Sequence, residues 1–192
     1  METKLFSSKF LESLKSLITQ HHSLYPRLPP QGIFFESLVE LAFKKSGWAE
    51  AQVVATSPNS PKHDLLVGES RLSIKSETGR ATRANSISIT KLCTTETGLW
   101  EPKSLVQHVL RHLSRYDRML MLRSIWQFRK AGTSKILRAF HYQLLEIPLD
   151  VLKLIATASI KQVGHRTGER KSLAGDAERD GKLILHVHFD GA

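Results

Sequence analysis

The segment from residue 63 to residue 77 carries an aspartate, a lysine and a glutamate at spacings that suit metal-assisted hydrolysis of a phosphodiester. Carboxylates bind a hard divalent cation through oxygen, and the bound cation neutralises a phosphate and lowers the pKa of a water ligand. A lysine beside them can orient that water and stabilise developing charge. The residues concerned are Asp64, Lys75 and Glu77.

These residues come together only if the segment folds as a β-hairpin. Its pattern predicts two strands, 63–67 and 71–77, joined by a tight turn. A two-residue loop places Asp64 opposite Ser73, and a four-residue loop places it opposite Lys75. Because alternate residues of a strand share a face, either even loop brings the aspartate to the side of the lysine. An odd loop would not, unless a β-bulge corrects the register. The alternative is an exposed hairpin whose polar face is simply solvated.

Asp64 and the triplet Ser73-Ile74-Lys75 resemble the core of the PD-(D/E)XK nuclease superfamily, especially the type II restriction endonucleases. In that superfamily an aspartate begins one strand and acid-x-Lys lies on the adjacent strand. A glutamate from a preceding helix often completes the site. Gly32-Ile33-Phe34-Phe35-Glu36 matches the common Gly-x-x-x-Glu helix start, and the resemblance covers residues 32–79.

The chain departs from the superfamily pattern at two positions. His63-Asp64 stands where the superfamily has Pro-Asp, and Ser73 stands where it has the acid of acid-x-Lys. Some restriction enzymes with Ser-x-Lys recruit the missing acid from elsewhere, and the candidates here are Glu36 first and Glu77 second. Glu36 has apolar neighbours, a costly setting for a carboxylate unless it is paired or bound to a cation. The alternative places it in an ordinary exposed stripe of helix charges.

The resemblance implies a Mg²⁺-dependent endonuclease that cuts both strands of double-stranded DNA, a sequence-specific type II restriction enzyme acting as a homodimer. Two alternatives stay open: a non-catalytic DNA- or RNA-binding protein, and a repair or mobile-element nuclease of the same fold. In the restriction-enzyme interpretation the metal ligands come from Asp64, Glu36 and Glu77. The full catalytic set would be Asp64, Lys75, Glu36, Glu77 and Ser73.

The charge balance independently favours a polyanionic partner. Lys and Arg number 28 against 18 acidic residues, which gives a formal net charge of +10. Such a surplus suits nucleic acid before an anionic membrane. The arginines that follow the catalytic strand could reach a phosphate or a base edge, and those on the helix could alternatively be a solvated face. The candidate DNA contacts are Arg80, Arg83, Arg111, Arg115 and Arg166.

Two histidine pairs offer other metal-binding patterns. His108 and His112 have the i, i+4 spacing of a zinc site on a helix, but no glutamate follows His108 and no partner cysteines are near. His186 and His188 share a strand face. In both pairs ordinary packing or solvation is the favoured interpretation.

The sequence predicts a protein of the reducing cytoplasm. No apolar run approaches the roughly 18 residues that span a bilayer. Lys9, Glu12 and Lys15 interrupt the N-terminal apolar pattern, which argues against a secretory signal. A single cysteine, Cys93, allows no internal disulfide.

The order of predicted elements indicates one α/β domain with a mixed β-sheet flanked by helices, restriction-endonuclease-like as the resemblance implies. Residues 1–30 would be an N-terminal helix with a Pro-rich connection, and residues 31–192 the nuclease-like domain. The segment 161–181 is predicted to be loop. Helices are predicted over 3–20, 33–46, 102–116 and 149–156, and strands over 51–57, 63–67, 71–77, 86–92, 118–125, 142–147 and 182–189.

Overall fold

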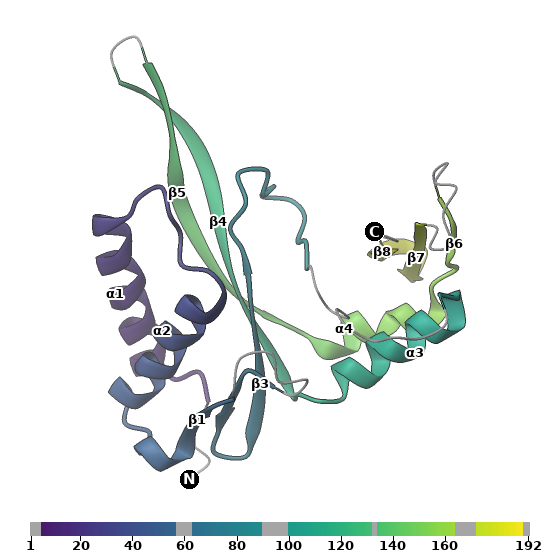
Figure 1. Ribbon diagram of the computed structural model, residues 1–192, viewed down its shortest axis with the longest axis horizontal. Coiled ribbons are helices and arrows are strands. Elements are labelled where there is room, and N and C mark those ends of the chain that lie inside the picture. The colour runs from purple at the N-terminus through teal and green to yellow at the C-terminus, as the bar shows by residue number, and fades with distance from the viewer. Residues whose placement is uncertain (1–4, 57–62, 90–99, 132–133, 164–171, 190–192) are drawn as a thin grey trace. The chain divides into compact units, whose positions relative to one another are not determined.

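The computed structural model describes residues 5–56, 63–89, 100–131, 134–163 and 172–189. The chain divides into two compact units (Figure 1), the first made of Met1–Thr90 with Tyr116–Ile147 and the second of Lys91–Arg115 with Pro148–Ala192. The expected boundary near residue 30 stays a prediction, and the helices on either side of it share one core.

A five-stranded mixed sheet forms the centre of the first unit, in the order β1-β2-β3-β4-β5. Neighbouring strands are antiparallel except β3 and β4, which are parallel. A 3-10 turn, Glu50–Gln52, precedes the first strand. The strands are β1 (Val53–Ala55), β2 (Leu65–Val67), β3 (Ser70–Glu77), β4 (Arg118–Ala131) and β5 (Ser134–Ile147).

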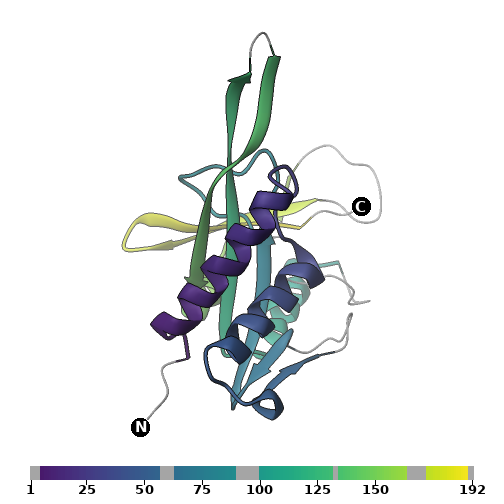
Figure 2. The same ribbon diagram turned by 90° about the vertical axis from the view of Figure 1, so that its left-hand side faces the viewer.

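Two helices, α1 (Ser8–Leu24) and α2 (Gly32–Lys45), cover one face of this sheet (Figure 2). The side chain of Ser7 caps α1 by accepting the backbone N–H of Phe10 at 3.2 Å. Phe10 of α1 and Phe43 of α2 are fully buried and stack with ring centroids 4.1 Å apart. This apolar layer fixes α2 against the strands that carry the candidate site.

The second unit combines short helices with a small sheet. The helix α3 (Pro102–Leu113) packs against α4 (Leu149–Lys153) and the 3-10 helix Leu154–Thr157. Its buried face consists of Leu105, Val109 and Leu113, the apolar positions at helical spacing. The antiparallel sheet contains β6 (Lys161–Gln162), β7 (Leu173–Arg179) and β8 (Lys182–Phe189).

Several sequence predictions need correction. The segment 161–181 is not all loop, because β6 and β7 lie in it; its residues 164–171 lie outside the described part. Residues 86–89 are not a strand, and 90–92 again lie outside the described part. The strands predicted over 118–125 and 142–147 are the two arms of a longer hairpin, β4–β5.

The architecture is nevertheless the mixed α/β, restriction-endonuclease-like fold that the sequence predicted. Helices flank a mixed sheet, and the chain between its two parallel strands, β3 and β4, contains α3. Among the described residues, every helix is too short or too polar to traverse a lipid bilayer.

Candidate active site

Asp64 lies immediately before β2 and opposite β3, in the position that a two-residue turn dictates. Val67 pairs with Ser70, and Gly68 adopts a φ of 58° in the turn between them. Glycine takes up this left-handed conformation at little cost. The two-residue loop is therefore confirmed over the four-residue alternative, and Asp64 falls opposite Ser73.

The Asp64 carboxylate is held by three donors from β3. Its Oδ2 accepts the backbone N–H of Ile74 at 2.6 Å and the hydroxyl of Ser73 at 3.2 Å. The Nζ of Lys75 lies 3.4 Å from the same oxygen. About a quarter of each charged side chain remains exposed, 26% for Asp64 and 22% for Lys75. The pair is thus oriented by the hairpin and still open to a substrate.

Hydrogen bonds tie the start of α2 to the end of β3. The N–H of Gly32 donates to the hydroxyl of Ser76 at 3.4 Å. One residue earlier, the side chain of Gln31 accepts the hydroxyl of Thr78 at 2.9 Å. These contacts, together with the apolar layer below, fix the first turns of α2 relative to the strand that carries the lysine.

Glu36, in the second turn of α2, shares the electrostatic environment of the hairpin pair. Burial raises the pKa of the Glu36 carboxyl, and the negative charge of Asp64 raises it further. The positive charge of Lys75 acts in the opposite direction. The structure therefore brings Glu36 within electrostatic reach of both residues.

Glu77 has a different partner. Its carboxylate accepts a hydrogen bond from Nε of Arg123, which stands beside it in the parallel β3–β4 register. Arg123 is 2% exposed and the Glu77 side chain 12%. The structure thus places Glu77 in a buried ion pair, whereas Ser73 and Lys75 contact the Asp64 carboxylate and Glu36 lies within electrostatic reach of it.

Two residues at this site carried no sequence prediction of their own. Tyr116, just before β4, is 2% exposed, and burial followed by the charge of Asp64 raises its pKa. Arg123, on β4, was not among the candidate catalytic residues or DNA contacts. Its position directly after the apolar run Met119–Leu122 was the available signal, because an arginine inside a buried strand needs acceptors.

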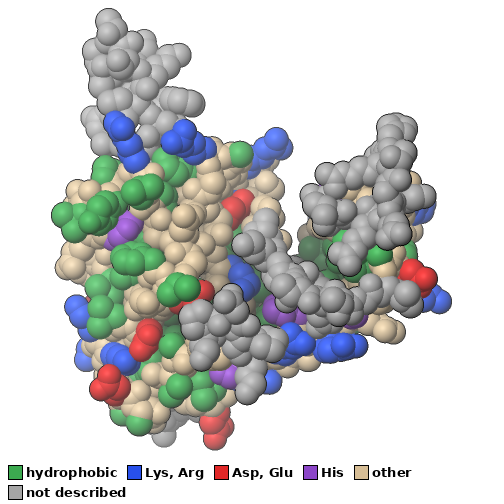
Figure 3. Space-filling model, in the orientation of Figure 1, with side chains coloured by type: hydrophobic (Ala, Val, Ile, Leu, Met, Phe, Trp, Pro, Cys, Tyr) green, Lys and Arg blue, Asp and Glu red, His purple; other side chains and the backbone are tan. Residues whose placement is uncertain are grey.

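The candidate DNA contacts fall on three parts of the chain. Arg80 and Arg83 are exposed in the segment after β3. In the second unit, Arg111 belongs to the last turn of α3 and Arg115 follows that helix. Arg166 lies outside the described residues. Figure 3 shows the distribution of basic side chains over one face of the molecule.

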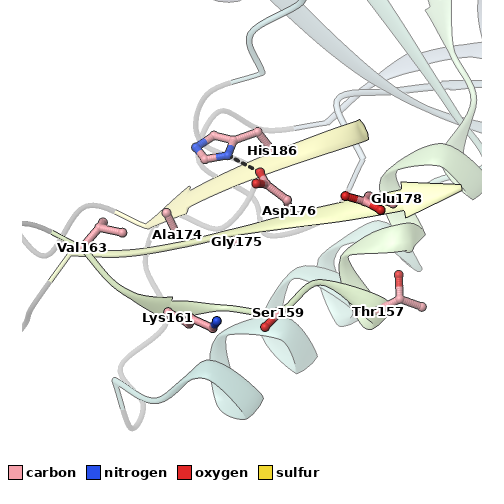
Figure 4. Close-up of a pocket in the computed structure, with 9 residues that line it drawn as sticks. All are labelled: Thr157, Ser159, Lys161, Val163, Ala174, Gly175, Asp176, Glu178 and His186. Carbon is pink, nitrogen blue, oxygen red and sulfur yellow. Dashed lines mark hydrogen bonds and ion pairs between the residues drawn. The ribbon is translucent and has the colours of Figure 1, made fainter. Parts of the chain in front are cut away.

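His186, one of the histidines of the second unit, lines a pocket of about 600 Å³. His186 on β8 contacts Asp176 on β7, with 2.6 Å between Nδ1 and Oδ1, and both side chains are more than half exposed (Figure 4). Within the described ranges, no group of three or more His, Cys, Asp or Glu side chains could hold a metal ion. Neither histidine pair belongs to a group of that kind.

The pair Asp64 and Glu36 fits the requirements of Mg²⁺. This ion keeps several of its waters and is bound by one or two carboxylates together with substrate phosphate oxygens. A set of three protein ligands is thus not needed. Burial raises the pKa of Glu36 and the negative charge of Asp64 raises it further, so a divalent cation near both carboxylates would be favoured.

Comparisons with known proteins identify the family of the chain. The family model SmaI, described as type II site-specific deoxyribonuclease, matches residues 2–192. The type II restriction enzyme SmaI of Serratia marcescens is 29% identical over 176 residues, which cover 91% of this chain and 66% of that enzyme. The chain thus spans just under two thirds of this relative's length. No solved structure matches the chain significantly.

Proposed function

This chain belongs to the SmaI family of type II site-specific deoxyribonucleases, and from that premise we propose that it is a Mg²⁺-dependent endonuclease. Its substrate is double-stranded DNA, which it cuts at a specific sequence as a type II restriction enzyme. One observation carries the proposal. Hydrogen bonds from β3 hold the Asp64 carboxylate beside the ammonium of Lys75, within electrostatic reach of Glu36.

Asp64 and Glu36 are the residues that would hold the cation. When bound, Mg²⁺ would neutralise the scissile phosphate and lower the pKa of a water ligand. Glu36 supplies the second carboxylate that Ser73 cannot supply. Glu77 is the less suitable ligand, because binding a cation would break its ion pair with the buried Arg123 and leave that charge uncompensated.

Lys75 and Ser73 have different roles around the aspartate. The ammonium of Lys75, partly exposed and 3.4 Å from Asp64, can donate to the attacking water and to a phosphate oxygen as charge develops there. Ser73 is buried and donates to Asp64 at 3.2 Å. It therefore orients the carboxylate and does not meet the substrate.

We also propose that the protein acts as a homodimer, so that each protomer cuts one DNA strand. Exposed apolar side chains support this assembly, because a surface of this kind is stabilised by burial in a second copy. They lie on α1, α2 and the connection between the helices, and comprise Leu24, Tyr25, Leu28, Ile33 and Phe34. Sedimentation equilibrium of the protein without DNA measures the assembly.

Incubation with DNAs of unrelated sequence tests the enzymatic proposal. We expect wild-type protein to produce discrete fragments with Mg²⁺ and none with EDTA. Asp64→Asn should produce none under either condition. Glu40→Gln is the matched control, because Glu40 lies one turn beyond Glu36 and pairs with Lys44 at 2.8 Å. DNA binding without cleavage of any substrate would instead favour a non-catalytic DNA-binding protein. The argument for that alternative is that Ser73 stands where the superfamily has an acidic residue.

A further inference from the structure

Arg123 is a buried arginine of β4 that joins three strands to an irregular segment. Its Nε donates to the carboxylate of Glu77 on β3, and its Nη1 donates to the side chain of Gln143 on β5 at 2.9 Å. Its Nη2 donates to the backbone carbonyl of Arg83 at 2.6 Å and to that of Ser86. One guanidinium thus connects the end of the Lys75 strand to the chain that follows it.

This arrangement is costly unless it serves a purpose beyond packing. A buried charge loses its hydration, and an apolar residue of similar size is often the more stable choice at such a position. Arg123 is 2% exposed and has one carboxylate partner. Two of its remaining acceptors are main-chain carbonyls in a segment without helix or strand, which water could have satisfied. The fork geometry of arginine instead fixes that segment to the sheet.

The segment that Arg123 holds, residues 78–89, has the character of an interaction surface. It contains two arginines and no acidic residue. Trp126 on β4 donates to the carbonyl of Thr78 at 3.1 Å, and the N–H of Thr82 donates to the carbonyl of Gly79 at 3.1 Å. The backbone is therefore anchored, while the side chains of Arg80 and Arg83 are exposed. Anchored backbone with exposed donors lowers the entropy cost of binding.

The segment also lies at a useful distance from the candidate active site. Five residues separate Arg80 from Lys75, and an extended chain spans at most about 18 Å over five residues. A DNA duplex rises by about 3.4 Å per base pair. The Cα atoms of Lys75 and Arg80 are therefore no farther apart than about five base-pair steps. Within that range exposed arginines contact phosphates or the edges of guanines.

We propose that Arg123 is a positioning residue that holds the segment 78–89 in its DNA-contacting conformation, so that the Arg123–Glu77 pair controls DNA affinity through Arg80 and Arg83. This inference rests on the proposed endonuclease function. It gives Glu77 a role in DNA binding in place of metal binding. The proposal also separates catalysis from binding. Lys75 on β3 takes part in the reaction, whereas Glu77 and the segment after β3 contribute to DNA affinity.

The test compares affinity with chemistry. Affinity is measured by titrating labelled DNA with proteins that all carry Asp64→Asn, so that no strand is cut. Arg123→Met should raise Kd by about 5- to 150-fold, the range expected for losing an arginine contact to DNA. Arg123→Lys should act in the same direction, because lysine keeps the charge and loses the fork. The single-turnover rate at saturating DNA, measured with Asp64 intact, should change by less than about threefold.

A double-mutant cycle tests whether Arg123 acts through the two exposed arginines. Arg80→Ala with Arg83→Ala should weaken binding in the Arg123-containing protein, but by less than about threefold further in the Arg123→Met protein. Backbone amides of residues 78–89 should also exchange hydrogen faster in Arg123→Met, with β3 unchanged. If Arg123→Met alone does not fold, Arg123→Met with Glu77→Gln removes both buried charges and permits the same measurements.

The outcomes are distinguishable. An unchanged Kd in folded Arg123 variants, or fully additive effects in the cycle, would overturn this inference while the enzyme stands. The inference would also be overturned if the single-turnover cleavage rate at saturating DNA fell as much as the affinity, because Arg123 would then affect the reaction itself. Wild-type protein that neither binds nor cuts DNA would remove the proposed function itself.

Discussion

The backbone N–H of Ile74 donates to the carboxylate of Asp64 at 2.6 Å, so the strand that carries Lys75 also aims the aspartate. A hydrogen bond to a charged acceptor is shorter and stronger than a neutral one. Because the donor belongs to the main chain, no substitution at position 74 other than proline removes it. The relative position of acid and lysine is therefore a property of the hairpin register, with Ser73 as a secondary support.

We predict that Asp64→Ala and Asp64→Asn lose cleavage activity to the same extent, and that Asp64→Ala loses more folding stability than Asp64→Asn. Either change should reduce the cleavage rate by at least about 10²-fold, the typical loss when one electrostatic group leaves an active site. Alanine also leaves the Ile74 N–H and the Ser73 hydroxyl without their acceptor, at a cost of about 1–3 kcal/mol, whereas asparagine keeps an oxygen there. Urea unfolding and plasmid cleavage measure both effects. Equal unfolding free energies for the two variants would contradict the proposed role of the hydrogen bonds.

The second prediction concerns Glu36, whose pKa is raised in the folded protein. A raised carboxyl pKa means that the charge favours the unfolded state. Stability from this group is thus fully present below the unfolded pKa and is lost as the pH rises through the folded pKa. At neutral pH and without divalent cation, Glu36→Gln should be as stable as wild type or more so, and its cleavage rate should fall by at least about 10²-fold.

Thermal melts and cleavage assays of Glu36→Gln, Glu40→Gln and Glu77→Gln decide the assignment of the second acid. Glu40→Gln loses its ion pair with Lys44 and should keep full activity. Retained activity in Glu36→Gln, with loss of Mg²⁺-dependent chemistry in Glu77→Gln at saturating DNA, would transfer the second metal ligand to Glu77. In that case the Arg123 pair would have to open when the cation binds.

The sequence predicted the geometry that depends on neighbours in the chain. A glycine turn and strict alternation fix the register of the β2–β3 hairpin, so Asp64 and Lys75 could be placed on one face before the structure was known. The periodic apolar residues of 33–46 predicted α2 to within one residue at each end, whereas those of 3–20 placed α1 four to five residues too early. Both features are local, and local patterns are what a single sequence records.

Contacts between distant segments were not predictable in the same way. Glu77 and Arg123 are 46 residues apart and meet only because β3 and β4 are parallel neighbours. The strand β7 was missed because its residues are small or polar, and it owes its conformation to pairing with β6 and β8. Gly175 in β7 lies so close to the Ser159 carbonyl that a Cβ would be 2.6 Å from it. In the sequence this glycine favoured a loop; in the structure it allows the strand to pack closely against the backbone of Ser159.

Mg²⁺ should stabilise the protein in the absence of DNA. A ligand that binds only the folded state adds about 1.4 kcal/mol at ten times its Kd, which for a protein of this size raises Tm by about 2–6 °C. The increase should appear in wild type and in Glu40→Gln, and should be smaller in Asp64→Asn and Glu36→Gln. Differential scanning fluorimetry in EDTA and then in excess MgCl₂ measures it, with NaCl of equal ionic strength as control. An equal increase in all four proteins would mean that the cation binds elsewhere.

DNA affinity should fall steeply with salt, and the arginines after β3 should account for part of the slope. Each neutralised phosphate contributes about 0.9 to the negative slope of log K against log salt. Arg80→Ala and Arg83→Ala should therefore each reduce that slope by about 1 if the side chain contacts a phosphate. If it contacts a base edge, the specificity at one position should relax instead.

Arg71→Ala is the matched control: Arg71 is also exposed and lies on β3, but its guanidinium pairs with Asp117 at 2.7 Å. Slopes measured by fluorescence anisotropy at several NaCl concentrations should thus be equal for wild type and Arg71→Ala. A wild-type slope near zero would exclude phosphate contacts as the source of affinity, and with them any use of the +10 net charge in holding DNA.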